Sequence, residues 1–160
     1  MSITDEIATW VAESEMNLTS EALRLARNAM IDIVGCMIAG ANDEATSCAK
    51  KAILDLSSGS ARLVGSEASL AAPHAALVNG TAAHALDFDD NYHPTAGHAT
   101  AVLAPAIFAL ADEHPIDGTM LLDSYIAGLE AMTVIGNGVN LAHYESVSYT
   151  HLRAHETSDY

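Results

Sequence analysis

Hydrophobic side chains recur along most of this chain at the three- and four-residue spacing of an amphipathic helix. The clearest case is residues 20–40, where one apolar stripe follows a capping Thr19 or Ser20 and stops at Gly40 and Asn42. The same pattern predicts further helices over residues 3–15, 44–57, 69–88, 100–114 and 117–138. Strand-like alternation is not sustained anywhere, so we predict an all-α fold.

Some local features modify this helical pattern. Polar and turn-forming residues replace it at residues 89–98, which predicts a loop between two helices. Gly80, among other small residues, would let a neighbouring helix approach closely, and Pro105 should kink its helix or lie near the first turn. Trp10, on the apolar face of the first helix, is expected in the core.

Composition supports the all-α prediction, because alanine fills 30 of the 160 positions and aromatic residues only 5%. The formal charge of −15, with no basic cluster to offset it, argues against nucleic acid and anionic membrane surfaces as partners. Every long apolar run is interrupted by polar residues, and no signal-like segment opens the chain. Because the two cysteines also lack CxxC spacing, we predict a cytoplasmic protein.

The densest group of ionisable side chains lies at the end of the fourth expected helix and in the following loop. It comprises His84, Asp87, Asp89, Asp90, His93 and His98. On a continuing helix His84 and Asp87 would share a face, and the loop could fold His98 back over the helix end. Carboxylates beside imidazoles suit proton transfer, because histidine titrates near neutral pH and a carboxylate can orient its ring.

Spacing alone leaves other interpretations of this group open. Asp89, Asp90 and His93 could simply cap helices and face water. A metal-dependent hydrolase could use four of the side chains as ligands, although no HExxH or CxxC frame is present: His84, Asp87, His93 and His98. Metal content after purification would identify the hydrolase, whereas a non-catalytic helical module would fold but bind no carboxylate.

Residues 79–112, NGTAAHALDFDDNYHPTAGHATAVLAPAIFALAD, resemble the signature of the MmgE/PrpD family. The matching features are the Asn-Gly pair, the AHALDFDD run, a His-Pro, a second histidine and a following apolar helix that contains Pro105. The likeness extends from about Ile3 to Glu145. It implies that residues 1–145 form the N-terminal portion of the family's all-helical domain, within a longer parent protein.

The family includes 2-methylcitrate dehydratases, cis-aconitate decarboxylases and an iminodisuccinate epimerase. The resemblance therefore implies a lyase of the 2-methylcitrate dehydratase type, in propionate metabolism, that abstracts a proton from a small di- or tricarboxylate with loss of water or carbon dioxide. By position in the motif, His98 and Asp87 would be catalytic, and Asn91 and His93 would contact the substrate. The resemblance implies no metal or other cofactor, and a homodimer for the full-length parent.

Residues 146–160 depart from the family pattern. The family has a Gly-aromatic-His-Pro string here, which contributes a second active-site histidine, but this chain reads SVSYTHLRAHETSDY, in which His151 is out of register. The SVSYTHLRAHETSDY sequence of this chain resembles a translated sequencing adaptor, so we expect residues 146–160 to be a non-native or disordered tail. We also expect this chain to lack lyase activity by itself.

Overall fold

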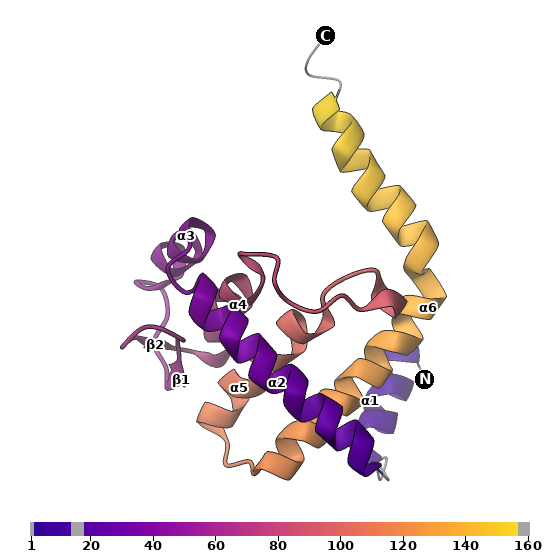
Figure 1. The fold of residues 1–160 in the computed structure, drawn as a ribbon, viewed down its shortest axis with the longest axis horizontal. Helices are drawn as coiled ribbons and strands as arrows, with labels where there is room; N and C mark the ends of the chain where they lie inside the picture. Colours follow the sequence, from indigo (N-terminus) through magenta and orange to yellow (C-terminus); the bar gives the residue numbers. More distant parts are fainter. Residues whose placement is uncertain (1, 14–17, 157–160) are drawn as a thin grey trace.

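The computed structural model describes residues 2–13 and 18–156, and its side chains as far as residue 139. Most of the described chain is helical and strand is almost absent from it, which confirms the all-α prediction (Figure 1). The elements in chain order are α1 (Ile3–Glu13), α2 (Ser20–Gly40), α3 (Glu44–Ile53), β1 (Ala61–Arg62), β2 (Ser69–Leu70), α4 (Ala72–His84), the 3-10 helix η1 (His93–Thr95), α5 (Ala99–Glu113) and α6 (Gly118–Glu156).

Side-chain caps fix where several helices begin. The Thr19 hydroxyl accepts a hydrogen bond from the backbone N–H of Ala22 at 3.1 Å, so Thr19 is the N-cap of α2. Asp117 likewise accepts from the backbone N–H of Met120 at 2.8 Å before α6, as its position in the sequence predicts. The caps therefore place these helices close to the positions that the sequence indicates.

The short segment between α3 and α4 forms a small antiparallel hairpin rather than a helix. Ala61 lies opposite Leu70, and both side chains are fully buried. The Asn79 side chain of α4 accepts from the backbone N–H of Val64 at 3.0 Å and donates to the carbonyl of Arg62 at 2.9 Å. Because an α4 side chain makes these bonds, the hairpin is fixed against the helical body.

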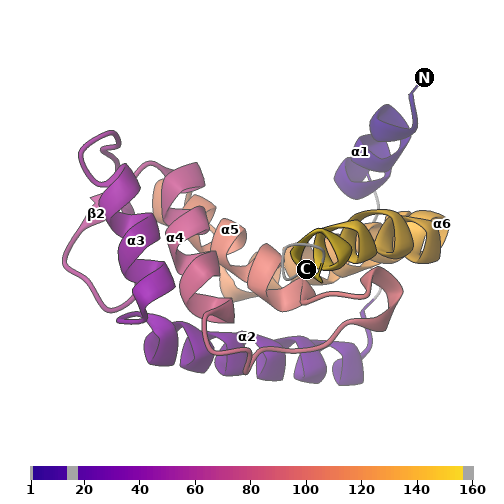
Figure 2. The ribbon, with the colours of Figure 1, turned by 90° about the horizontal axis from the view of Figure 1, so that it is seen from above.

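The core forms where α2, α4, α5 and α6 pack together, and α2 lies along one side of the other helices (Figure 2). Ile33 and Met37 of α2 are almost completely buried. A Cβ atom at Gly80 would lie 3.3 Å from the carbonyl oxygen of Ala101 and 3.8 Å from the ring of Pro105, so α4 and α5 approach closely at this glycine. Pro105 itself lies inside α5, beyond its first turn.

The prediction that the last helix ends near Gly136 and Gly138 is wrong, because α6 continues without interruption to Glu156. A glycine inside a helix costs only about 1 kcal/mol relative to alanine, which a long helix tolerates. Packing explains the glycine at position 136, because a Cβ atom there would lie 2.3 Å from the carbonyl oxygen of Pro94 in η1. The division of the chain at residue 145 into domain and tail stays a prediction, and residues 157–160 lie outside the described part.

The expectation that Trp10 lies in the core is also wrong. Trp10 is 40% exposed, and α1 has no buried residue over its length. The helix packs only at the edge of the body, where Ile7 and Trp10 line a shallow hollow with Val134 of α6. Within residues 2–13 and 18–156, no helix combines the length and hydropathy that a bilayer-spanning helix needs.

We predict that circular dichroism of the 160-residue chain will show a strongly helical spectrum, with minima near 208 and 222 nm for the backbone order described here. The two-residue strands are too short to contribute a visible strand signal. A spectrum dominated by strand would contradict this architecture.

Candidate active site

The ionisable group begins where α4 ends. The helix stops at His84 instead of continuing through Asp87, so the two residues do not share a helical face as expected. The backbone N–H of Asp87 donates to the carbonyl of His84 at 3.0 Å, and Asp87 adopts a left-handed conformation with φ of 54°. Aspartate and asparagine adopt this conformation more readily than most side chains. The resulting turn sends the chain back toward α2.

The loop that follows is fixed at several points rather than solvated throughout. Asp90 accepts a hydrogen bond from the backbone N–H of Thr100 at 3.1 Å, so it caps α5, as the capping interpretation requires for this residue. The Tyr92 hydroxyl contacts the Thr133 hydroxyl of α6, and Tyr92 and Gly97 form an isolated β-bridge. These contacts hold the backbone on both sides of His98.

Asp89 lies at the centre of the cluster. Its side chain has no exposed surface, and its Oδ1 atom lies 2.9 Å from Nδ1 of His84. Its Oδ2 atom lies 3.2 Å from Nδ1 of His98, at an angle too poor for a well-formed hydrogen bond. The two imidazole rings are tilted against each other with centroids 4.4 Å apart. One buried carboxylate therefore faces two imidazoles.

The structure brings together the two residues predicted to be catalytic. Nε2 of His98 lies 3.7 Å from Oδ1 of Asp87, whose side chain is 80% exposed. Asn91 and His93 are both exposed, and His93 is not in the group of ligand-type atoms formed by His84, Asp87, Asp89 and His98. Their role as substrate contacts stays a prediction, as do the catalytic roles of His98 and Asp87.

The central position of Asp89 was not predicted from the sequence, where Asp89 was one of six ionisable residues in the group and capping a helix was one of its possible roles. The run of Asp87, Phe88, Asp89 and Asp90 gives no sign of which carboxylate turns inward, because the turn after α4 decides it. The structure leaves Phe88 69% exposed and buries Asp89. The one available signal was the proximity of His84, a polar residue at the end of an alanine-rich helix.

The carboxylates of the cluster place negative charge next to one face of α2. Burial, followed by the charges of Asp32 and Asp89, raises the pKa of the Cys36 thiol, and Asp90 adds to the shift. Burial likewise raises the pKa of Tyr125, whose hydroxyl lies 2.7 Å from that of Thr100. Both groups are therefore held neutral near the carboxylates, and neither carries reactive charge.

The donor set of the cluster includes types that also bind metals. One ligand atom from each of His84, Asp87, Asp89 and His98 lies within 4.8 Å of the others. Around a tetrahedral zinc ion with bonds of about 2.0–2.1 Å, ligand atoms lie only about 3.4 Å apart, so the group would have to contract. The sequence suggested His93 as one of four metal ligands, whereas the structure places Asp89 in the group and not His93. The metal-dependent hydrolase stays an alternative prediction.

An open groove of about 800 Å³ runs beside the cluster between α4 and α5. His84 and His98 line one part of it, and Leu77, Gly80 and Val102 line another. The groove therefore joins the imidazoles to an apolar surface that a small molecule could contact.

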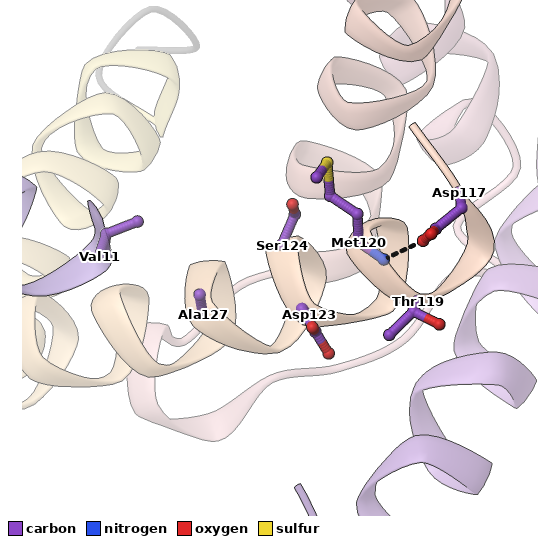
Figure 3. Close-up of a pocket in the computed structure, with 7 residues that line it drawn as sticks. All are labelled: Val11, Asp117, Thr119, Met120, Asp123, Ser124 and Ala127. Carbon is purple, nitrogen blue, oxygen red and sulfur yellow. Dashed lines mark hydrogen bonds between the residues drawn. The ribbon is translucent and has the colours of Figure 1, made fainter. Parts of the chain in front are cut away.

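A second hollow, of about 380 Å³, lies between α1 and the start of α6 (Figure 3). It is lined by Val11, Asp117, Thr119, Met120, Asp123, Ser124 and Ala127. The carboxylate of Asp117 is engaged in capping α6, and no imidazole is among the lining side chains. Among the described side chains, this hollow therefore lacks the imidazole–carboxylate pairing of the first site.

Fold and site together define an all-helical domain with a histidine–carboxylate cluster beside an open groove. The sequence pattern of the MmgE/PrpD N-terminal domain matches residues 5–156. The chain belongs to the MmgE/PrpD family.

Curated relatives support this assignment. The chain is 30% identical over 136 residues to cis-aconitate decarboxylase of Homo sapiens and 29% identical over 136 residues to that of Mus musculus, in each case over 81% of this chain and 28% of the relative. It is 25% identical over 146 residues to the cis-aconitate decarboxylase-like protein oryM of Aspergillus oryzae, over 86% of this chain and 30% of the relative. The chain thus spans less than a third of the length of these relatives, which are lyases by name.

Proposed function

We propose that this chain supplies the proton-transfer half of a lyase site that acts on a small di- or tricarboxylate. The observation that carries the proposal is the meeting of His98, Asp87 and Asp89 at the edge of the groove. A histidine that lines a groove and has one ring nitrogen beside a buried carboxylate is arranged as a general base. The lyase names of the relatives are consistent with this chemistry.

In a dehydration of the 2-methylcitrate type, Nε2 of His98 takes the proton from the carbon beside a substrate carboxylate. The electron pair of that C–H bond forms a carbon–carbon double bond while the hydroxyl group leaves and is protonated to water. In a decarboxylation, the protonated ring instead gives its proton to the carbon skeleton, and the electron pair of the broken C–C bond stays on the substrate as carbon dioxide leaves. Once Nε2 is protonated, Asp87 accepts its hydrogen bond and orients the ring, or Asp87 accepts a hydrogen bond from the substrate. Asn91 and His93 provide further polar contacts.

The described chain does not provide the positive charge that a polycarboxylate needs. No lysine or arginine lines the groove. Arg24 is paired with Glu21 and Arg62 with Asp112, both away from the cluster. We infer that cationic side chains for substrate binding come from parts of the complete protein outside residues 1–145.

We further propose that the complete protein is a homodimer in the cytoplasm, that it requires no cofactor, and that it works in propionate metabolism. In that protein residues 1–145 are the N-terminal part of the helical domain, and residues 146–160 of the present chain are a non-native or disordered tail. Size-exclusion chromatography with light scattering tests the dimer, and the reading frame beyond Glu145 tests the tail.

We predict that the complete protein will convert cis-aconitate or 2-methylcitrate, whereas the 160-residue chain will convert neither at a measurable rate. The reason is the lack of cationic side chains at the groove and of the second histidine that the family motif contributes. Loss of substrate and formation of product are followed by chromatography. Turnover by the 160-residue chain would contradict the predicted inactivity, and failure of the complete protein with every small polycarboxylate would contradict the proposed function.

A further inference from the structure

We propose that Asp89 is a positioning residue that fixes the proton of His98 on Nδ1 and leaves Nε2 as the base, and that His84 holds Asp89 in place for this task. The inference rests on the proposed function for its catalytic meaning. The proton position itself does not depend on activity and is measured separately.

The burial of Asp89 supports this role first. A carboxylate with no exposed surface is costly to keep charged unless N–H donors compensate it. The Nδ1 atoms of His84 and His98 lie beside its two oxygens, at 2.9 and 3.2 Å. Each imidazole therefore places its Nδ1 proton on Asp89, because the ionised carboxylate offers no proton in return.

The two contacts differ in quality, which gives the two histidines different roles. The contact from His84 is a short hydrogen bond and fixes the carboxylate from the end of α4. The contact from His98 is longer and poorly aligned, although both atoms are buried and have no other hydrogen-bond partner in the described structure. A small rotation of the His98 ring would align them, as often happens when a catalytic site binds its substrate.

Asp89 decides the proton position although several other charged groups lie nearby. Asp87 faces the opposite nitrogen of His98, at 3.7 Å, and is mostly exposed. Asp90 is turned toward the first turn of α5, and Asp32 and Cys36 lie on α2. Of these groups, only Asp89 combines full burial with a position between the two Nδ1 atoms.

The direct test is the protonation state of the His98 ring in the 160-residue chain. Nitrogen-15 NMR separates protonated from unprotonated ring nitrogens, and single His→Asn variants assign the eight histidines. In buffer at about pH 9 with a chelator present, where an ordinary imidazole is neutral, we expect a proton on Nδ1 and none on Nε2 of both His84 and His98. A proton on Nε2 of His98 under these conditions would overturn the proposal.

The variant Asp89→Asn tests the cause with almost no change of shape. An amide accepts from one ring but donates to the other. Because the shorter contact with His84 should keep the accepting oxygen, we expect the His98 ring to move its proton to Nε2. Asp90→Asn is the matched control, because asparagine caps a helix as well as aspartate does and both rings should keep their proton on Nδ1. Unchanged rings in Asp89→Asn, or the same change in Asp90→Asn, would contradict the role of Asp89.

Kinetics of the complete protein separate the inference from the proposed function. Asp89→Asn should lower kcat by about 10²-fold or more with KM changed less than about threefold. This is expected when His98 keeps its position but carries its proton on Nε2, the nitrogen that should act as the base. His84→Asn retains an N–H near the position of Nδ1 and should keep more activity than His84→Ala; equal loss in both would overturn the anchoring role of His84. If the His98 proton moves and kcat does not change, the positioning role stands and the proposed function fails.

Discussion

Replacing His98 with asparagine in the complete protein is expected to lower kcat by about 10²-fold or more while leaving the fold intact. Asparagine keeps a hydrogen-bonding group of similar reach, but it cannot carry a proton between substrate and solvent. His98 stands just before α5 and makes no side-chain cap, so the helix does not depend on it. Steady-state kinetics with cis-aconitate or 2-methylcitrate, together with circular dichroism, measure the two effects separately.

His114→Asn is the matched control, because His114 stands at the other end of the same helix and is exposed. It should leave kcat unchanged. Asp87→Asn should also reduce turnover, and asparagine tolerates the left-handed backbone found there. Near-parental kcat and KM in His98→Asn would remove the catalytic role of this residue. Loss of bound metal together with activity would favour the metal-dependent hydrolase.

The second large effect is expected at Gly40, the last residue of α2. A Cβ atom there would lie 2.1 Å from the carbonyl oxygen of Ala82 and 3.3 Å from the side chain of Ala85, so even alanine forces α2 and α4 apart. We expect Gly40→Ala to lower the free energy of unfolding by about 3 kcal/mol, the upper range for an overpacked core. Urea unfolding followed by circular dichroism measures this difference.

Gly35→Ala provides the comparison on the same helix. A Cβ atom at Gly35 would have no other atom within 4 Å, so alanine should only restrict the unfolded chain and favour the helix. We expect this variant to raise the free energy of unfolding by about 0.5–1 kcal/mol. Similar losses in both variants would indicate that the close approach of α2 and α4 at Gly40 is not a feature of the folded protein.

The sequence predicted the fold well where local rules decide the outcome. Thr19 and Asp117 cap helices as their side chains indicate, and the apolar stripe of α2 lies in the core. The rules failed where contacts between distant residues decide. Gly136 looked like the end of a helix but allows the approach of Pro94, and Trp10 looked like core but lies on a helix that packs at an edge.

The candidate site was predictable as a group of residues but not as an arrangement. Motif and spacing placed His98 and Asp87 together, and the structure brings them within 3.7 Å. The central place of Asp89 depends on where α4 stops and on the left-handed turn at Asp87, which no periodicity reveals. A sequence shows which residues can carry charge, but burial decides which charge controls its neighbours.

The close approach of α4 and α5 at Gly80 helps to fix the distance between the two imidazoles, because each ring stands at one end of these helices. Gly80 precedes His84 by one helical turn, and Ala101, the residue it approaches, follows His98 in the first turn of α5. Pro105 has no N–H to bond the Ala101 carbonyl, so that carbonyl is left facing α4. The spacing of the rings thus depends on two helices in contact as well as on the loop over residues 91–97, which Tyr92 ties to α6. A side chain larger than glycine at position 80 would therefore shift both imidazoles together.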